Sequence, residues 1–398
     1  MRDAEMTALI RASLPTLKAE GETLTRLFYH KLLAAHPELQ YLFNPVNQAQ
    51  GTQQRALASV ICAYAAHIDQ PQALKDSISL IANKHVALGV RAEHYPLVGQ
   101  TLLASLKELL GDQATPRLLE AWALAYQQLA DHLIRNEADL YQQQYQQFAW
   151  QGFKPVVVSD KQKESRNICS FYIRHIDNRP LAAHRPGQYV TLKLPQTDGQ
   201  MMCRHYSISN VPGEGAYRIS VRRHVTAGQP DGLVSNYLHD AIRSGDAILM
   251  APPSGDFVLE TTDKPLLLVA GGIGITPLMS MLHASLQQTP DRPVTLIQSV
   301  RHLQDLPFEA ELSRLTVNQP QFRWQVCLTG EAPGRQVQGA SVTGQRLDDD
   351  LFNQLTGQQA ADTYACGPRG MLEDLRSIID NRDLSDDRLI SEQFSPAS

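Results

Sequence analysis

The first residue of chemical interest is His85, which lies in an apolar helical pattern from Ile81 to Leu88. A single histidine on a helix is more often structural than functional, so its neighbours matter. Gln53 and Leu57 are spaced four residues apart and share one predicted helical face. Gln53 is polar on an otherwise apolar stripe, and such a residue usually faces a buried polar partner or a ligand. These residues make a ligand pocket in this helical region a hypothesis.

A second chemical signal is the glycine-rich turn Gly271–Pro277, with the sequence GGIGITP. It follows Pro265–Ala270, an apolar run that predicts a buried strand, and it begins a helix predicted from Thr276 to Ser285. Glycines let the backbone approach a pyrophosphate, Thr276 can cap the helix, and Pro277 suits its first turn. The turn therefore predicts a nicotinamide dinucleotide site. A purely structural turn would leave the Thr-Pro pair unexplained.

The elements that position these residues differ along the chain. Residues 1–150 are rich in Ala, Leu and Gln, with apolar residues at helical spacing. The spacing predicts an all-α region of about six to eight helices, the last ending between Tyr141 and Trp150. Helix breaks are predicted at Pro15, Pro37, Asn44–Pro45, Pro71, Pro96 and Gly111–Asp112.

After Pro155 the pattern becomes that of short strands separated by Gly, Pro, Asp and Asn, which predicts an antiparallel β-barrel. Its strands are expected at Val156–Val158, Ser170–Ile173, Gln188–Leu192 and Tyr217–Val221. From Lys264 strands alternate with helices, which predicts a parallel sheet covered on both faces. The later elements are expected at Val294–Ser299, Phe308–Leu315, Arg323–Leu328, Thr363–Ala365 and Met371–Ile379.

Composition restricts the classes of function. The 398 residues are 43% hydrophobic and 19% charged, as in a globular chain of several domains. A net charge of −5 argues against nucleic acid as a partner, and five scattered cysteines without a CxxC pair argue against a disulfide framework or thiolate metal site. Without a signal peptide or a run of about 18 apolar residues, we expect no transmembrane segment and a cytoplasmic protein. A monomer is the default expectation.

Residues 1–140 resemble a bacterial globin, in which helices pack around a haem held by one proximal histidine. The resemblance implies that His85 is the iron ligand and that Phe43 wedges against the haem. It also implies that Tyr29 and Gln53 are the distal residues and that Leu57 contacts the haem. A distal tyrosine hydroxyl donates a hydrogen bond to a diatomic ligand with partial negative charge.

The same resemblance implies a proximal group of Tyr95, Glu137 and Lys84. The tyrosine and the glutamate would hydrogen-bond His85, and an acceptor on the second ring nitrogen favours activation of dioxygen over its storage. Lys84 would influence the haem and flavin potentials. The alternatives are a solvated glutamate in a polar stretch and a lysine that is only a surface charge.

Motifs in the second part resemble the flavin-binding domain of the ferredoxin-reductase family. Arg204–Ser207 matches RxYS, which implies that Arg204 pairs with the FAD pyrophosphate, Tyr206 lies against the isoalloxazine ring and Ser207 bonds near N5. Three further motifs follow the family order, at Arg185–Tyr189, Gly232–Leu238 and Pro252–Phe257. The implied FAD contacts are Tyr189, Arg204, His205, Tyr206, Ser207, Gly232, Val234 and Ser235.

The glycine-rich turn resembles the GGxGxTP nicotinamide motif of that family. The implied NAD(P)H contacts are Gly271, Gly272, Ile273, Gly274, Ile275, Thr276, Pro277 and, from a CGP motif, Cys366, Gly367 and Pro368. For Cys366 a buried structural thiol is the alternative. A segment that covers the flavin would comprise Glu392, Gln393, Phe394, Ser395 and Pro396, with Glu392 tuning the potential. Gln393 and Ser395 depart from the usual Cys and Gly, and the effect is open.

From about residue 5 to 396 the chain resembles bacterial flavohaemoglobin (flavohemoprotein). The resemblance implies a globin domain at 1–140, a linker at 141–152, an FAD-binding barrel at 153–262 and an NAD(P)H-binding α/β domain at 263–398. It implies haem b, FAD and NADH or NADPH as cofactors. Arg301 would bind a 2′-phosphate and favour NADPH, or be a surface residue, since the family commonly uses NADH.

The function that this resemblance implies is a nitric oxide dioxygenase. Electrons would pass from NAD(P)H through FAD to haem, and nitric oxide and dioxygen would become nitrate. The alternative is an oxygen-binding haem protein with a general NAD(P)H-dependent or peroxide reductase activity. An apolar distal pocket, with Leu57, Ile61 and Leu102 as lining residues, would admit lipid-like molecules in that case.

Overall fold

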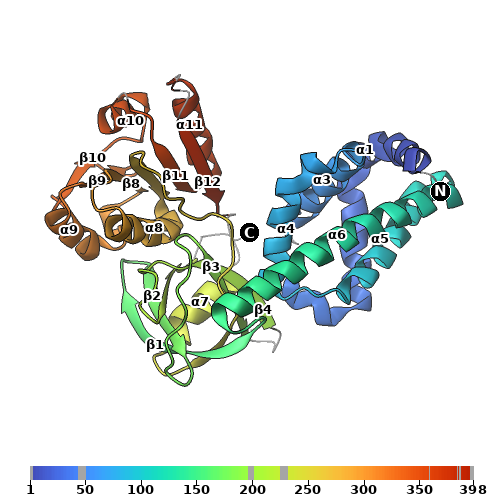
Figure 1. Cartoon of the computed structure of the whole chain (residues 1–398), viewed down its shortest axis with the longest axis horizontal. Helices are drawn as coiled ribbons and strands as arrows, with labels where there is room; N and C mark the ends of the chain where they lie inside the picture. The colour runs from blue at the N-terminus through green and yellow to red at the C-terminus, as the bar shows by residue number, and fades with distance from the viewer. Residues whose placement is uncertain are drawn as a thin grey trace. The chain divides into compact units, whose positions relative to one another are not determined.

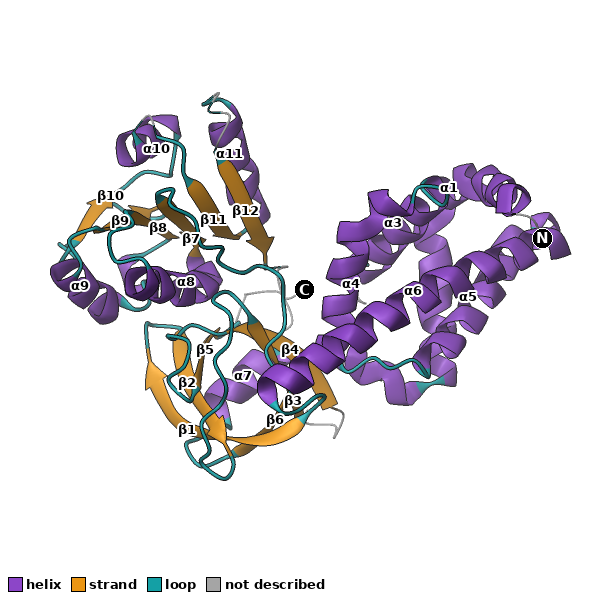
Figure 2. Ribbon diagram, viewed as in Figure 1, coloured by secondary structure: helices purple, strands orange, loops and turns teal. Residues whose placement is uncertain are grey.

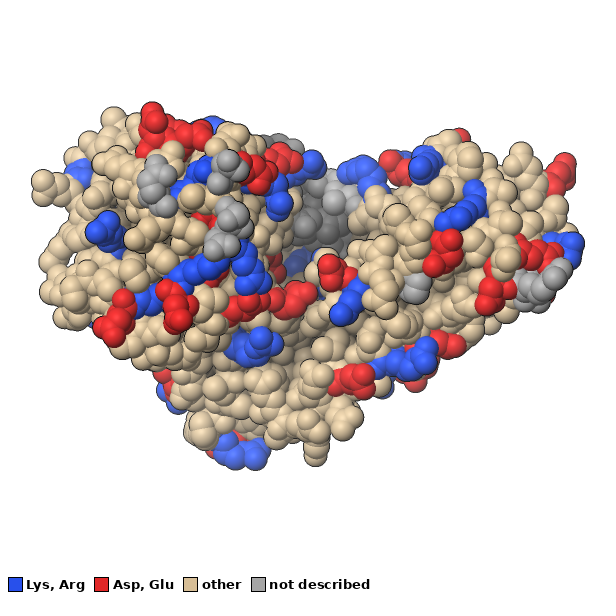
Figure 3. All heavy atoms as spheres, turned by 45° about the horizontal axis from the view of Figure 1, so that its top comes forward, with Lys and Arg blue, Asp and Glu red and all other residues tan. Residues whose placement is uncertain are grey.

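The computed structural model describes residues 3–43, 51–195, 201–224, 232–357, 359–382, 384 and 387–394. The chain forms two compact units, with most residues up to Phe153 in the first and most residues from Lys154 on in the second (Figure 1). The described residues up to Phe153 form helices and turns, whereas those from Lys154 on form two sheets with helices (Figure 2). On the face in Figure 3, basic and acidic side chains are interspersed. No helix among the described residues is long and apolar enough to cross a membrane.

The described part of the first unit up to Phe153 is all-α, as its apolar spacing predicted. Its elements are α1 (Asp3–Ala35), η1 (Pro37–Leu42), α3 (Thr52–Ala66), η2 (Pro71–Leu74), α4 (Lys75–Leu88), α5 (His94–Leu110), η3 (Gly111–Gln113) and α6 (Pro116–Phe148). The break predicted at Pro15 is wrong, because Pro15 lies inside α1. A proline inside a helix costs about 3 kcal/mol. Burial of Ile10, Leu17 and Leu24 on one face of α1 offsets this, at roughly 1.5–3 kcal/mol for each side chain.

The last helix of this unit is α6, with 33 residues. Thr115 caps its start by accepting a hydrogen bond from Leu118 N at 3.2 Å, and Pro116 occupies its first turn. The helix continues to Phe148 and ends at Ala149 in the left-handed conformation, with φ 63°. The last predicted helix therefore ends within Tyr141–Trp150, as expected, and residues 141–148 are its last turns.

Two close helix contacts occur within the first unit. A Cβ atom on Gly21 of α1 would lie 3.2 Å from the Cβ of Ala58 on α3. A Cβ atom on Gly99 of α5 would lie 2.5 Å from the Tyr126 ring on α6, so glycine is needed there for the ring to pack. At these glycines, α1 packs against α3 and α5 packs against α6 more closely than a larger side chain would allow.

The first sheet of the second unit has the strand order β4-β3-β6-β1-β2-β5, and β1 pairs antiparallel with both β2 and β6. Its elements are β1 (Lys154–Lys163), β2 (Ile168–His175), β3 (Tyr189–Pro195), β4 (Met201–Ser207), β5 (Tyr217–Arg222), α7 (Leu233–Asp240) and β6 (Ala247–Met250). The predicted antiparallel sheet is confirmed. The strand β6, which has only four residues, was not predicted from the sequence.

The second sheet is parallel, with the strand order β10-β9-β8-β7-β11-β12. Its elements are β7 (Leu266–Gly271), η4 (Gly272–Gly274), α8 (Ile275–Gln288), β8 (Val294–Val300), η5 (Leu303–Asp305), α9 (Glu309–Asn318), β9 (Phe322–Leu328), β10 (Ala340–Thr343), α10 (Asp349–Thr356), β11 (Asp362–Gly367), α11 (Arg369–Asp380) and β12 (Arg388–Gln393). From β7 the chain moves outward to β10 and then returns to β11 on the other side. A parallel sheet opens a binding crevice at such a switch point, beyond the carboxyl ends of its strands.

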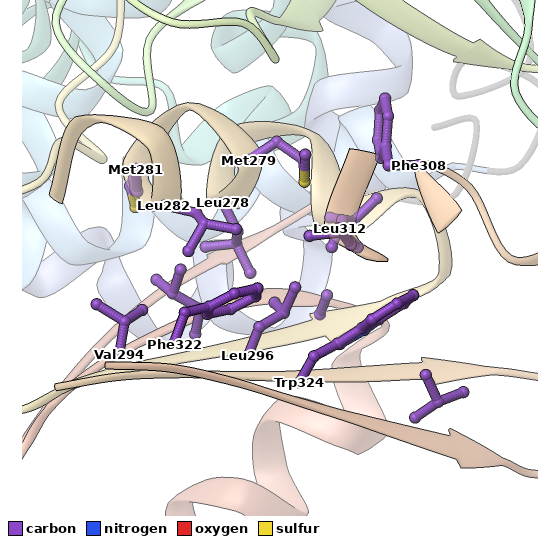
Figure 4. Packing of buried hydrophobic residues seen from close by; sticks show 14 of the residues in the cluster. Leu278, Met279, Met281, Leu282, Val294, Leu296, Phe308, Leu312, Phe322 and Trp324 are labelled. Carbon is purple, nitrogen blue, oxygen red and sulfur yellow. The ribbon is translucent and has the colours of Figure 1, made fainter. Parts of the chain in front are cut away.

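Alternate residues of β7 pack into two hydrophobic layers. Leu266 and Leu268 belong to the cluster that contains α8 and α9, part of which Figure 4 shows around Leu282. Leu267 and Val269 belong to the cluster that contains α10 and α11. Helices therefore cover both faces of the sheet, as the fully apolar strand predicted.

Candidate functional site

The ring of His85 lies in the last turn of α4, where two other side chains meet it. Its Nδ1 is 2.8 Å from Glu137 Oε1 and 3.1 Å from the Tyr95 hydroxyl. The Tyr95 hydroxyl also donates a hydrogen bond to the same carboxylate oxygen. Because the carboxylate can only accept, Nδ1 carries the ring proton in this network and Nε2 keeps its lone pair. Nε2 is therefore the ring atom available to a metal ion.

The Glu137 carboxylate is buried, with only 2% of the residue exposed. An ionised carboxylate at such a depth needs partners, and His85 and Tyr95 supply them. Burial and the hydrogen bond to Glu137 raise the pKa of the Tyr95 hydroxyl, which therefore stays a donor. Tyr126 donates to Tyr95 O at 2.7 Å and Tyr141 donates to Val90 O at 2.7 Å, so α6 holds the segment that carries Tyr95. Lys84 is exposed on α4, and its expected influence stays a prediction.

Tyr29 is buried on α1 between two aromatic rings. The Phe28 ring lies 5.1 Å away and the Phe43 ring 5.4 Å away between centroids, both edge to face. Burial raises the pKa of the Tyr29 hydroxyl, so it remains protonated. Within the described part of the chain, this hydroxyl has no hydrogen-bond partner. Gln53 is partly buried in the first turn of α3.

An apolar cavity of about 90 Å³ lies inside the helical unit. Leu57, Ile61 and Leu102 line it, as expected. The other lining residues were not predicted from the sequence; they are Phe28, Val60, Tyr64, Val98, Trp122, Tyr126 and Leu129. They are ordinary members of apolar helical stripes, so only the packing distinguishes them.

In the second unit, the flavin motifs come together through β3, β4 and a turn. The rings of Tyr189 and His205 lie 4.7 Å apart, and His205 Nδ1 is 2.8 Å from Thr191 Oγ1. Gly187 has a φ of 101°, and a Cβ atom there would lie 2.1 Å from Phe257 O. Glycine is thus required where the Arg185–Tyr189 turn meets the Pro252–Phe257 turn.

Two other predicted flavin contacts, Val234 and Ser235, have side chains that already contact other groups of the protein. The Ser235 hydroxyl donates to Gly232 O at 3.1 Å at the start of α7, and Val234 is buried. The backbone amides of Val234 and Ser235 nevertheless lie in the first turn of α7, where N–H groups have no acceptor within the helix. Burial raises the pKa of Tyr206, whereas the charge of Arg204 acts in the opposite direction. Ser207 is buried at the end of β4.

The nicotinamide motifs meet at the switch point between β7 and β11. A Cβ atom on Gly274 would lie 2.1 Å from Cys366 O, and one on Gly271 would lie 2.6 Å from the Pro368 ring. The expectation that Thr276 caps a helix is wrong, because the turn η4 precedes and α8 already begins at Ile275. The Thr276 hydroxyl instead donates to Ile273 O at 3.0 Å.

A cavity of about 800 Å³ opens at this end of the parallel sheet. Of the predicted contacts, Gly271, Gly272, Ile273 and Pro368 line it. Gly274, Ile275, Thr276, Pro277, Cys366 and Gly367 are not among its lining residues. Several lining residues from other elements were not predicted from the sequence, namely Arg166, Arg222, Arg223, Thr329, Arg346 and Asp374. A cavity of this size suits an extended dinucleotide.

Three domain families match successive parts of the chain. Residues 26–133 match the globin family, residues 155–259 the oxidoreductase FAD-binding domain and residues 268–377 the oxidoreductase NAD-binding domain. A flavohemoprotein of Deinococcus radiodurans is 40% identical over 400 residues, which cover 100% of this chain and 98% of the relative. This chain belongs to the flavohemoprotein family. A flavohemoprotein of Pseudomonas aeruginosa is 39% identical, over 98% of this chain and 97% of that relative.

Two solved structures are similar to this flavohemoprotein. A flavohemoglobin from Malassezia yamatoensis, determined with bound FAD and haem, has a TM-score of 0.84 and 26% identity, over 98% of this chain and 99% of that one. The FAD/NAD-binding domain of a nitric oxide dioxygenase from Vibrio cholerae has a TM-score of 0.55 and 27% identity, over 61% of this chain and 99% of that one. The matched domain families make this flavohemoprotein an oxidoreductase that uses haem, FAD and a nicotinamide dinucleotide.

The residues around His85 fit a haem. In the described ranges, no group of three or more His, Cys, Asp or Glu side chains is placed to hold a metal ion. An iron ion on His85 therefore needs a group that brings its own ligands, as a porphyrin does. The His85 side chain is 32% exposed although Nδ1 is bonded, and its helix is surrounded by apolar side chains. This donor set would hold the iron of a haem through Nε2.

The C-terminal strand links the flavin and nicotinamide motifs of this flavohemoprotein. Glu392 on β12 is the register partner of Cys366 on β11. The charge of Glu392 adds to burial in raising the pKa of both Cys366 and Tyr189. Glu392 therefore lies near a residue of each motif. Cys366 is fully buried in the hydrophobic core, whereas Ser395 and Pro396 lie outside the described residues.

Proposed function

We propose that this flavohemoprotein is a nitric oxide dioxygenase that oxidises nitric oxide with dioxygen to nitrate at the expense of NADH or NADPH. The observation that carries the proposal is the buried Glu137 carboxylate on His85 Nδ1. A protein that only stores dioxygen has no need to bury an acid behind its proximal ligand, whereas an oxygen-activating protein gains from it. When bound, FAD takes a hydride and releases single electrons, and haem offers the iron at which dioxygen reacts.

Glu137 and Tyr95 act together on the proximal ring. The carboxylate accepts the Nδ1 proton of His85, which raises the electron density on Nε2. Tyr95 donates to the same carboxylate and so limits how far the proton moves toward it. The two residues also fix the ring orientation, because His85 is tied to α5 through Tyr95 and to α6 through Glu137.

Tyr29 supplies a hydrogen-bond donor in apolar surroundings. Its pKa is raised by burial, so the hydroxyl keeps its proton at any physiological pH. No protein acceptor among the described residues competes for that proton. A donor of this kind stabilises the partial negative charge that develops on a reduced diatomic ligand. Gln53, on the neighbouring helix α3, is proposed to assist it.

The reductase part would supply electrons in the number that nitrate formation requires. One hydride carries two electrons, and each nitric oxide that joins one dioxygen to form nitrate consumes one electron. One dinucleotide therefore supports two turnovers and releases one proton. Tyr189, Tyr206 and Ser207 are proposed to hold the flavin, and the glycine turn Gly271–Gly274 is proposed to hold the dinucleotide.

The proposal is tested by the consumption of nitric oxide in air, measured with an electrode on the haem- and flavin-loaded protein. We expect rapid consumption that needs both dioxygen and the dinucleotide, with one nitrate formed for each nitric oxide consumed. Dinucleotide oxidation without such consumption would reject the dioxygenase in favour of a general reductase. Reversible dioxygen binding without either reaction would favour an oxygen carrier.

Tyr29→Phe tests the distal donor. Removing one preorganised donor from a low-dielectric site lowers turnover by roughly 100-fold. We expect this loss together with faster dissociation of dioxygen in stopped-flow measurements. Tyr64→Phe is the matched control, because the Tyr64 hydroxyl already donates to Ala125 O at 2.9 Å. An unchanged dissociation rate in Tyr29→Phe would refute the role given to Tyr29.

A further inference from the structure

The helix α8 follows the glycine turn and has polar side chains in its middle that bond to other elements. It begins at Ile275, directly after the turn η4, so a displacement of the helix displaces the turn. Ser280 and His283 are three residues apart and therefore share one face of α8. Both side chains form hydrogen bonds to groups outside α8. Whatever holds this face also holds the glycine turn, about 9 to 14 Å away along the helix axis.

Ser280 is bonded to a histidine of the FAD-binding domain. The buried His184 lies between β2 and β3, and its Nε2 is 2.8 Å from Ser280 Oγ. The His184 ring packs edge to face on the Tyr217 ring of β5, with centroids 5.7 Å apart. Burial lowers the pKa of His184 to about 4, so this ring is neutral at physiological pH. Beside it, a Cβ atom on Gly187 would lie 2.5 Å from Met281 Cε, so α8 packs closely on the same segment.

His283 is bonded to a carboxylate that β5 shares. Glu311 lies in the first turn of α9, and its Oε1 is 2.5 Å from His283 Nε2. Arg218 of β5 donates to both oxygens of this carboxylate, with Nη1 2.6 Å from Oε2 and Nη2 3.3 Å from Oε1. Its guanidinium also donates to Ser209 O at 2.6 Å and to Ser209 Oγ at 3.0 Å. A two-point pairing of arginine with carboxylate fixes orientation as well as distance, so Glu311 joins α8 and α9 to β5.

The pair of Arg218 and Glu311 is largely shielded from water. The Arg218 side chain is 6% exposed and the Glu311 side chain 21%. Burial acts to raise the pKa of Glu311, but the hydrogen bond from His283 and the charge of Arg218 outweigh it and lower the pKa to about 2. The carboxylate therefore stays ionised and can only accept, so His283 Nε2 carries a proton. Arg166 and Asp305 form another pair between the two domains, but Arg166 is 53% exposed, so solvent screens that pair.

The residue before α9 supports the same arrangement. Phe308 has a φ of 60°, a left-handed conformation that is uncommon for a bulky side chain. Its ring is buried, and the ring centroid lies 4.7 Å from Arg218 Cζ (Figure 4). Such a backbone conformation persists only where the surroundings hold it. Here the packing of the ring and of Arg218 on it supplies those surroundings, and the start of α9 is fixed beside β5.

We propose that Arg218 and Glu311, together with the hydrogen bond between His184 and Ser280, are positioning residues for flavin reduction. They hold α8, and with it the glycine turn, at one distance and angle from the FAD-binding domain. A misplacement of about an ångström at a reacting site slows the reaction by about 100-fold even when the reactant stays bound. The inference rests on the proposed function only in requiring a dinucleotide that reduces a flavin, and the reaction at the haem does not enter it.

The test is anaerobic flavin reduction, followed by stopped-flow absorbance on the haem- and flavin-loaded full chain. The dinucleotide is whichever of NADH and NADPH reduces the unchanged protein faster. Arg218→Met combined with Glu311→Met removes both charges, so neither is left buried without its partner. We expect the limiting rate of reduction to fall by about 10-fold to 100-fold, with the apparent Kd of the dinucleotide nearly unchanged. Reduction by dithionite, which needs no dinucleotide, should keep its normal rate.

Three outcomes for the double variant would overturn the inference. A normal limiting rate would show that the pair does not position α8. A raised Kd with a normal limiting rate would place the pair in dinucleotide binding. Slower reduction by dithionite, or loss of FAD, would show a general structural effect.

Two milder variants decide the question if the double variant folds poorly. Arg218→Lys keeps the charge but loses the two-point pairing, so its limiting rate should lie between those of the double variant and the unchanged protein. Ser280→Ala removes the partner of His184 and should also lower the limiting rate at a nearly unchanged Kd. Normal limiting rates in both would overturn the inference.

Glu309→Gln is the matched control on α9. Glu309 precedes Glu311 by two residues and pairs with Arg335 of its own domain rather than with the FAD-binding domain. Its limiting rate should be normal. An equal fall in Glu309→Gln would show that any change in α9 slows reduction, and the assignment to Glu311 would be wrong.

The proposed function is judged separately, by nitric oxide consumption of the unchanged protein. Absent consumption together with slowed flavin reduction in the double variant would reject the dioxygenase and keep this inference. Normal consumption together with normal flavin reduction in the double variant would do the reverse.

Discussion

The surroundings of His85 and the nicotinamide cavity differ in how their charged and polar groups are paired. Around His85, the polar groups bond to one another in a small buried network, and Glu137 is almost without exposure. In the cavity of about 800 Å³, three arginines face open space without an ion pair among the described residues. The polar groups around His85 therefore have partners without a ligand, whereas the three arginines of the cavity, Arg222, Arg301 and Arg346, would gain partners from a bound anion.

This difference follows from the size and charge of what each region would bind. A haem iron would take a single ring nitrogen from His85, so its binding depends on a ring that buried partners already orient. A dinucleotide carries its own negative charges, so an open cationic surface attracts and aligns it. The paired polar groups around His85 therefore suit a ligand held by one ring nitrogen, and the unpaired arginines of the cavity suit an anionic ligand.

His85→Ala should have the largest effect and should separate the two regions. Without Nε2 the iron loses its protein ligand, so we expect a complete loss of haem absorbance and of nitric oxide consumption. Reduction of the flavin by dinucleotide should continue at its normal rate, because the glycine turn and the flavin motifs belong to the other unit. Absorbance spectra and stopped-flow flavin reduction measure both. Loss of flavin reduction would show that the regions are not independent.

Gly274→Ala is the reciprocal experiment. A Cβ atom would lie 2.1 Å from Cys366 O, so the backbone of η4 or β11 must shift. We expect the rate of flavin reduction to fall by about 100-fold, since misplacement by about an ångström at a reacting site has this cost. The haem spectrum should be unchanged. Gly334→Ala is the control, because a Cβ atom added there would meet nothing within 4 Å. A normal rate in Gly274→Ala would mean that this close approach is dispensable.

These experiments depend on contacts that the sequence predicted unevenly. His85, Tyr95 and Glu137 were predicted together, because a family pattern carried the long-range pairing that spacing alone cannot supply. Arg166 and Arg222 were missed as lining residues of the cavity, since they come from the β1–β2 turn and from β5 and carry no motif. The edge strands β10 and β12 were missed because neither has the apolar alternation or run that marks a buried strand. Pro15 was misjudged because local propensity yielded to the packing of α1.

Glu137→Gln should have an intermediate effect confined to the helical unit. The amide preserves shape but loses the charge that polarises His85, so we expect haem to remain bound while turnover falls by about 10-fold to 100-fold. The iron–histidine stretching frequency in resonance Raman spectra should decrease, which a purely structural role would not cause. Asp139→Asn is the matched control, two residues further along α6 and exposed. Normal turnover with an altered spectrum would mean that electron donation by His85 does not limit the reaction.

Ionic strength should give the smallest effect and the sharpest contrast between the two regions. Salt screens exposed charges, with a Debye length that falls from about 10 Å at 0.1 M to about 3 Å at 1 M. Raising salt from about 0.05 M to about 0.5 M should increase KM for the dinucleotide roughly 3-fold to 10-fold, because Arg222, Arg301 and Arg346 act on an anion. KM for nitric oxide, a neutral molecule that would meet the buried Tyr29 hydroxyl, should stay constant. A salt-dependent KM for nitric oxide would mean that charge also governs entry to the helical unit, and the contrast drawn between the two regions would fail.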